Sequence, residues 1–79
     1  MEPFLITLND KAEEFEMLVH EGIEFTYILS GALTYRVGER IYRMGAGDSV
    51  CFDSASPHGP EGLISIPVKL ITVIGSSQV

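Results

Sequence analysis

Residues 20–31 read His-Glu-Gly-Ile-Glu-Phe-Thr-Tyr-Ile-Leu-Ser-Gly, and this stretch decides the fold class. From Glu24 to Ser30 the even positions would face one side of an extended chain and the odd positions the other, because side chains alternate along a strand. Apolar residues occupy both sides. We expect a β-strand here that stops at Gly31 and is buried on both faces.

Outside this strand, the remaining apolar residues also fall in short runs separated by turn-forming residues. Gly38 and Glu39 predict a tight hairpin between two of them, since glycine tolerates the positive φ of such a turn. Pro67 is expected to interrupt the last run, because proline cannot donate to a central ladder. The runs span residues 4–8, 15–20, 33–37, 40–44, 49–52 and 63–74. This spacing predicts six to eight short antiparallel strands, an all-β barrel or two-sheet roll.

The length of 79 residues allows one domain, residues 1–79, with one small core. Cys51 is the single cysteine and can form no internal disulfide, so a reducing, cytoplasmic location is the simpler expectation. A small core without a disulfide is only marginally stable. Strands that are apolar on both faces also need a second chain or domain to bury their outer face. We therefore expect a homodimer.

The formal net charge of −6 repels phosphate backbones and anionic lipid headgroups. Direct contact of this chain with DNA is therefore not expected. No apolar run approaches the ~20 residues needed to span a bilayer, and the start of the sequence does not resemble a signal peptide. We expect no association with a membrane.

Two histidines and one glutamate could form a metal site. His20 and Glu24 would lie ~13 Å apart on a straight strand, so they can converge only if the chain bends at Gly22. If His58 joins them, two imidazoles and one carboxylate suit Fe, Mn, Ni, Co or Zn in the divalent state. The alternative is that each histidine is structural or exposed, which is the commoner role of a lone histidine at a strand end.

Alternation also predicts the lining of an apolar cavity that would bind a small, partly apolar molecule. Arg36 or Arg43 could bind a carboxylate there if either side chain faced inward, although an exposed position is expected for both. The predicted lining residues are Thr26, Ile28, Leu33, Tyr35, Tyr42, Phe52 and Ile71.

The spacing of His20, Glu24 and Gly31 resembles the first sequence block of the cupin superfamily, with Leu18 in place of its first histidine. Gly47, Asp48 and His58 keep the register of the second block, and the likeness extends over residues 4–74. The resemblance implies a small cupin-type double-stranded β-helix, or jelly-roll barrel, of the compact single-domain kind. It further implies that His20, Glu24 and His58 bind a metal, since cupin epoxidases hold iron on three such ligands.

Residues 20–27, 47–50 and 52–58 are also similar to the cupin sensor domains of helix-turn-helix transcriptional regulators. This likeness implies a ligand-sensing module that binds a small molecule and reports its presence to a DNA-binding partner domain. The alternative is a stand-alone metal-dependent cupin enzyme of the oxygenase, isomerase or lyase type. Whether the chain is an enzyme stays open at this point.

Overall fold

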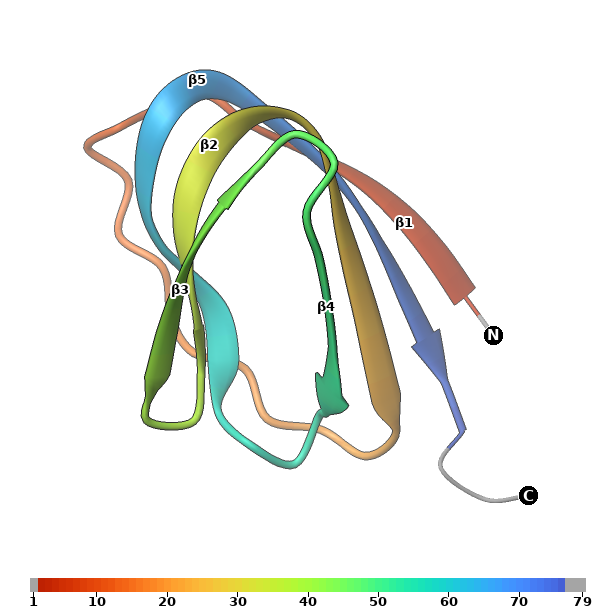
Figure 1. Cartoon of the computed structure of the whole chain (residues 1–79). Coiled ribbons are helices and arrows are strands. Elements are labelled where there is room, and N and C mark those ends of the chain that lie inside the picture. Colours follow the sequence, from red (N-terminus) through yellow and green to blue (C-terminus); the bar gives the residue numbers. More distant parts are fainter. Residues whose placement is uncertain (1, 77–79) are drawn as a thin grey trace.

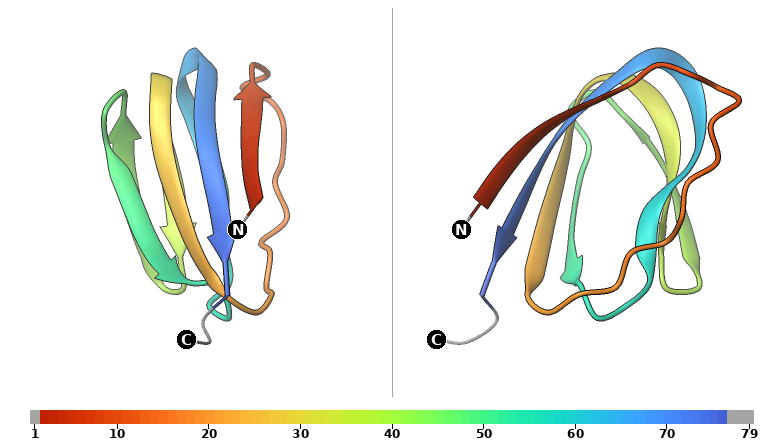
Figure 2. Two further views of the ribbon diagram at one scale, coloured as in Figure 1. Left: turned by 90° about the vertical axis from the view of Figure 1, so that its right-hand side faces the viewer. Right: turned by 180° about the vertical axis from the view of Figure 1, so that it is seen from behind.

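The computed structural model describes residues 2–76, which form five antiparallel strands (Figure 1). The strands follow the sheet order β1-β5-β2-β3, and β4 also pairs with β2. Figure 2 shows β1, β5 and β2 lying side by side in that order. The strands are β1 (Glu2–Leu8), β2 (Ile23–Val37), β3 (Arg40–Gly45), β4 (Ser49–Asp53) and β5 (His58–Gly75). The predicted all-β, antiparallel jelly-roll class is confirmed.

The two long strands, β2 and β5, pair with each other and bend together over the interior of the protein (Figure 1). The first part of β2 pairs with β4, and its last part pairs with β3. The predicted turn at Gly38 connects β2 to β3. The later part of β5 pairs with β1. Because both long strands curve, one continuous sheet folds over a core.

Gly31 does not end the strand as expected, because β2 runs through it to Val37. Gly31 has a φ of 79°, and a Cβ there would collide with the carbonyl oxygens of Ser65 and Pro67 on β5. The residue is therefore a point of close approach inside a bent strand. Only glycine fits, since it has no Cβ and adopts positive φ freely.

Pro67 likewise does not interrupt the last strand, and β5 is continuous from His58 to Gly75. The pairing of β5 with β2 shifts in register opposite Gly31, and Pro67 has no partner on either neighbouring strand. No ladder hydrogen bond from its nitrogen is required there, so proline is tolerated. These two continuations, together with the absence of a strand at residues 15–20, explain why the described residues form five strands and not six to eight.

Residues 15–20, expected as a strand, form only an isolated bridge in the loop between β1 and β2. Leu18 and His58 exchange backbone hydrogen bonds of 2.8 Å and 3.0 Å, which holds the loop against the start of β5. In Figure 2 this loop runs beside the first part of β5. The contact positions the residues immediately before β2.

Side chains alternate along β2 between Glu24 and Leu29, but only one face is buried in this chain, not both as expected. Glu24, Thr26 and Ile28 are buried, whereas Phe25 and Leu29 are exposed on the outer face. The buried apolar core consists of Ile28, Leu33, Tyr35, Met44, Val68 and Leu70. The described residues contain no helix long and apolar enough to cross a membrane.

Candidate metal centre and adjoining cavity

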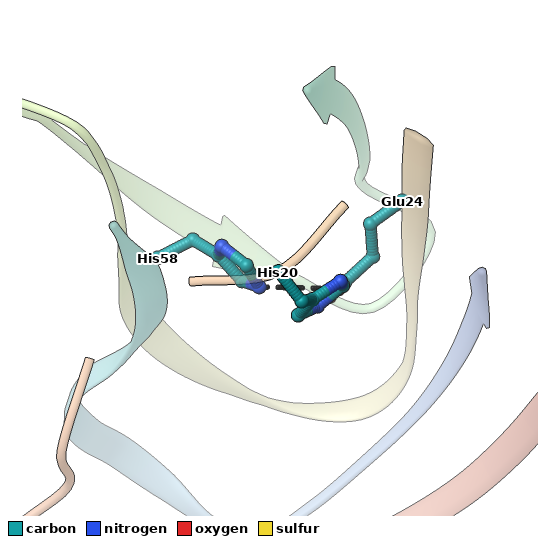
Figure 3. A group of neighbouring side chains, drawn as sticks. All are labelled: His20, Glu24 and His58. Atoms are coloured by element: carbon teal, nitrogen blue, oxygen red, sulfur yellow. Dashed lines mark hydrogen bonds and ion pairs between the residues drawn. The ribbon is translucent and has the colours of Figure 1, made fainter. Parts of the chain in front are cut away.

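Three side chains meet within the curved sheet: His20 from the loop before β2, Glu24 from β2 and His58 from the start of β5 (Figure 3). The Nε2 atom of His20 lies 3.1 Å from Oε1 of Glu24, and Nε2 of His58 lies 3.2 Å from the same oxygen. One potential ligand atom from each residue lies within 4.8 Å of the others. The structure thus brings together the three residues that the sequence singles out.

Gly22 produces the bend that this convergence needs. Its φ is 113°, and a Cβ there would lie 2.5 Å from the carbonyl oxygen of Gly75. Two backbone hydrogen bonds hold this bend. The amide of His20 donates to the carbonyl oxygen of Ser54, and the amide of Ser54 donates to the carbonyl oxygen of Gly22. The chain turns sharply between His20 and Glu24, so both side chains point to one place.

Both imidazoles are oriented by a backbone carbonyl. His58 Nδ1 lies 2.8 Å from the carbonyl oxygen of Ser56, and His20 Nδ1 lies 3.1 Å from that of Glu21. A carbonyl oxygen can only accept, so each Nδ1 carries the hydrogen. In a neutral imidazole Nε2 then carries the lone pair, as in histidines that bind a metal. Nε2 of His58 has no hydrogen-bond partner, whereas Nε2 of His20 is within hydrogen-bond distance of Oε1 of Glu24, the direction in which a metal would lie.

His58 is 1% exposed, and its Nε2 has no hydrogen-bond partner. Glu24 Oε1 is close enough for contact, but the alignment is not that of a hydrogen bond. An imidazole lone pair and a carboxylate oxygen repel each other unless a cation lies between them. The unsatisfied nitrogen and the converging oxygen fit a divalent transition metal.

The second carboxylate oxygen of Glu24, Oε2, is hydrogen-bonded by two buried hydroxyl groups. Tyr35 Oη donates to Oε2 over 3.3 Å, and Thr26 Oγ1 lies 3.5 Å from the same atom. Thr26 is in turn 3.1 Å from the hydroxyl of Thr72. Burial, together with the nearby Glu24 carboxylate, raises the pKa of Tyr35, which keeps its hydroxyl protonated as a donor. Oε1 is thereby left to face the histidines.

A cavity of about 510 Å³ opens beside this cluster, and His20 and Glu24 form part of its wall. Strands β1 and β5 supply most of its apolar surface, and the loop between β1 and β2 supplies the rest. The lining residues are Phe4, Ile6, Leu8, Glu13, Glu14, Phe15, Glu16, Leu18, His20, Glu24, Tyr35, Gly59, Pro60, Leu70, Thr72 and Ile74.

Of the seven residues predicted to line a cavity, Tyr35 does so. Ile28 and Leu33 pack in the core instead, and Thr26 lies behind Glu24. Phe52 packs against His58 with ring centroids 4.8 Å apart. The remaining two, Tyr42 and Ile71, also lie outside the cavity lining.

The cavity differs from the predicted one because its wall comes from β1 and the later part of β5, which pair across a long separation in sequence. Phe4, Ile6 and Leu8 share one face of β1, and Leu70 shares the same cavity through that pairing. The alternation within residues 4–8 was the available signal for these residues. Nothing in the sequence marked residues 13–16 as cavity wall.

The arginines considered as carboxylate binders do not line the cavity. Arg36 forms an ion pair with Glu61, with Nε to Oε2 at 2.6 Å and a second hydrogen bond at 3.1 Å. Hydrogen bonding from Arg36 lowers the pKa of Glu61. Arg43 is exposed on β3. Both agree with the expected outward orientation.

Comparisons with known proteins were made for both sequence and structure. The family profile of the cupin domain matches residues 4–74. A search of curated protein sequences found no match. A crystal structure of Fe(II) HppE is similar to this chain, with a TM-score of 0.77, 20% identity, and coverage of 92% of this chain and 41% of that chain.

Two further structures are similar. The conserved SPY1581 protein of unknown function from Streptococcus pyogenes has a TM-score of 0.78, 19% identity, and coverage of 98% of this chain and 65% of its own. Fe(II)-HppE with the alternative substrate (S)-1-HPP has a TM-score of 0.75 and 20% identity, with coverage of 92% and 41%. The chain therefore spans less than two thirds of the length of these solved structures. On the extent of the sequence match, together with this shared fold, the chain belongs to the cupin domain family.

Proposed function

We propose that this chain is a ligand-sensing cupin domain that binds one divalent transition metal at His20, Glu24 and His58 and a small organic molecule in the adjoining cavity. The observation that carries the proposal is the convergence of two imidazole Nε2 atoms on one carboxylate oxygen, within 3.2 Å, without a hydrogen bond from the buried His58. A cation bound between these atoms would satisfy all three at once.

Each of the three side chains has a defined part in holding the ion. The histidines present Nε2 because Nδ1 is used by backbone carbonyls, and Glu24 presents Oε1 because Oε2 is used by Tyr35. Three protein ligands leave positions on the metal free for solvent or an organic molecule, which the metal can polarise as a Lewis acid. His20 and Glu24 line the cavity, so a bound molecule would contact this centre directly.

Sensing requires that occupation of the cavity be reported to a second domain or chain. The net charge of −6 opposes direct binding of this chain to DNA, and none of residues 2–76 is helical. A DNA-binding helix-turn-helix would therefore belong to a partner outside the described residues. Ligand binding would act by shifting the population of conformations that this partner recognises.

A second candidate is a metal-dependent enzyme of the oxygenase, isomerase or lyase type. The observation that favours it is the fold likeness to structures of Fe(II) HppE, one of them with an alternative substrate. Metal loading is common to both candidates. Turnover separates them, because a sensor returns its ligand unchanged whereas an enzyme converts it.

The test is metal titration of chelator-treated protein by calorimetry, followed by elemental analysis, with anaerobic Fe(II), Mn(II), Co(II), Ni(II) and Zn(II). We expect one ion per chain and loss of at least about 100-fold in affinity in His20→Ala, Glu24→Ala and His58→Ala, since each removes a direct ligand. Glu21→Ala changes an exposed neighbour and serves as the matched control. Absence of binding by every ion, or equal affinity in all four variants, would overturn the proposal.

A further inference from the structure

The outer face of four neighbouring strands is apolar. Over residues 23–27, β2 lies between β4 and β5, and β1 pairs with the other edge of β5 (Figure 2). Residues directly opposite each other in an antiparallel pair lie on the same face of the sheet, so Phe25 shares the outer face with Cys51 of β4 and Val73 of β5. The next row continues this pattern. The large apolar residues of this surface, which we call the outer apolar face, are Leu5, Phe25, Tyr27, Leu29, Ile71 and Val73.

The outer apolar face is exposed in a chain whose core is small. Six hydrophobic side chains form the buried core, whereas eleven large hydrophobic side chains among the described residues are exposed. The exposed fraction is 69% for Leu5, 43% for Leu29 and 39% for Phe25. Single exposed apolar residues are ordinary, but a contiguous apolar patch on a soluble protein marks an interaction site.

Charged side chains lie at the two ends of this surface and not in its middle. Asp53 ends β4, Lys69 lies on β5 opposite the last residues of β1, and both are exposed. The rise along a strand puts these two ends roughly 20 Å apart. The remaining charged residue on the strand segments that build the surface is Glu24, which points inward; the segments are residues 3–7, 23–29, 49–53 and 69–75. An apolar centre with charges at the rim is the composition of a protein interface.

The size of the surface is that of a dimer interface. Four strands about 4.8 Å apart and seven residues long, at about 3.3 Å per residue, cover roughly 450 Å² in flat projection. Exposed side chains stand up from the sheet and add to this projection, and the rim adds further area. The surface thereby approaches the ~800 Å² per partner that a stable interface buries.

A second copy of the chain fits this surface by its charge. The net charge of −6 makes two copies repel each other on average. Asp53 and Lys69 have opposite signs, so the outer apolar face with its two ends is neutral, and two copies meet least repulsion there. Contacts in a two-fold-related pair occur twice, so Asp53 of each copy can approach Lys69 of the other.

We propose that two copies of this chain pack their outer apolar faces against each other about a two-fold axis and form a homodimer. The cavity lies on the other side of the same strands, and no residue of the outer apolar face lines it. The dimer therefore leaves the cavity and the candidate metal ligands open. This inference goes beyond the proposed function and depends on neither the metal nor the organic ligand.

Analytical ultracentrifugation of metal-free protein in reductant, from low micromolar to submillimolar concentration, tests the association. We expect twice the mass of the chain at high concentration and dissociation on dilution. Phe25→Lys puts a charge in the middle of the outer apolar face and should weaken association at least about 100-fold, because two like charges would be buried together. Ile41→Lys makes the same change on β3 outside this face, at a residue that is 51% exposed, and should associate like the wild type. Circular dichroism checks the fold of both variants.

Cys51 provides a test in the wild-type chain that does not depend on the folding of a variant. It is the single cysteine, it is exposed, and it lies opposite Phe25. Its rate of alkylation by excess iodoacetamide should fall about tenfold between dilute and concentrated protein, because only the monomer presents the thiol. Glutathione, alkylated under the same conditions, controls for the reagent. In Phe25→Lys the rate should not depend on protein concentration.

Three results would overturn this inference: a monomer at every concentration, a dimer that Phe25→Lys and Ile41→Lys weaken equally, or a dimer in which Cys51 reacts as fast as in the monomer. The first result leaves the face to another partner, and the other two place the dimer contact elsewhere on the chain. None of them bears on metal binding, which is measured separately by titration.

Discussion

The hydroxyl of Tyr35 donates a hydrogen bond of 3.3 Å to Oε2 of Glu24. Tyr35 is buried on β2, and its ring packs near Phe52 with centroids 6.0 Å apart. The bond fixes the carboxylate so that Oε1, not Oε2, faces the two histidines. Tyr35 therefore acts as a positioning residue for the candidate metal centre, through Glu24.

Tyr35→Phe should weaken metal binding by about 10- to 100-fold, because loss of a partner that orients a ligand has effects of that size. The ring remains, so the core packing with Phe52 is kept. Competition with a chelator measures the affinity, and circular dichroism checks the fold. Tyr42→Phe alters a tyrosine that is 37% exposed and should leave the affinity unchanged. An equal affinity in Tyr35→Phe and wild type would contradict the positioning role.

Stability at alkaline pH should also depend on Tyr35. Burial and then the Glu24 carboxylate raise its pKa above the ordinary value of 10.0, so the folded state holds this proton more tightly than the unfolded state. Its contribution is fully present below pH 10 and is lost as the pH rises toward the folded pKa. Relative to Tyr35→Phe, the wild type should lose free energy of unfolding between about pH 10 and 11.5 in urea titrations. A difference that stays constant over this range would refute the effect.

Gly31→Ala should destabilise the fold by about 2–4 kcal/mol, because a Cβ at this position meets backbone carbonyls of β5 that cannot move independently. Gly38→Ala is the matched control, since Gly38 also has a positive φ but a Cβ there meets nothing within 4 Å. That control should cost about 1 kcal/mol, the cost of the backbone conformation alone. Chemical denaturation measures both, and equal losses would show that the close approach is unimportant.

The hydroxyls of Thr26 and Thr72 pair across β2 and β5 at 3.1 Å in a buried position. Replacing Thr72 alone with valine should cost about 1–2 kcal/mol, because the hydroxyl of Thr26 loses a buried partner. The double replacement by valine should cost about 1 kcal/mol less than the sum of the single ones. Thr34→Val, which removes a hydroxyl bonded to the carbonyl of Gly62, should instead be additive with Thr72→Val. Strict additivity in both combinations would contradict the pairing.

Local pattern was sufficient to predict the all-β class and the inner face of β2. Alternation depends on neighbouring residues only, and it put Glu24, Thr26 and Ile28 on the same side of the strand, which the structure shows to be the buried one. The convergence of His20 with Glu24 was also accessible, because the bend it needed could be assigned to the glycine between them. The role of these residues as metal ligands stays a prediction.

Features that depend on the register between distant strands could not be predicted from local sequence pattern. Gly31 and Pro67 look like strand ends when each is considered alone, but they face each other in one irregular stretch of the β2–β5 ladder. The cavity wall was missed for a related reason. It arises where Phe4 and Ile6 on β1 lie beside Leu70 on β5, and local alternation gives no information about which distant strands become neighbours.

Strand β1 supplies Phe4, Ile6 and Leu8 to the cavity, whereas the three candidate metal ligands come from the following loop and from β2 and β5. The residues that would determine the shape of a ligand are thus separated in the chain from the three candidate metal ligands. Substitutions at Phe4, Ile6 and Leu8 should therefore change what the cavity admits without altering the three candidate metal ligands. Directed evolution toward new small molecules should begin by randomising these three positions.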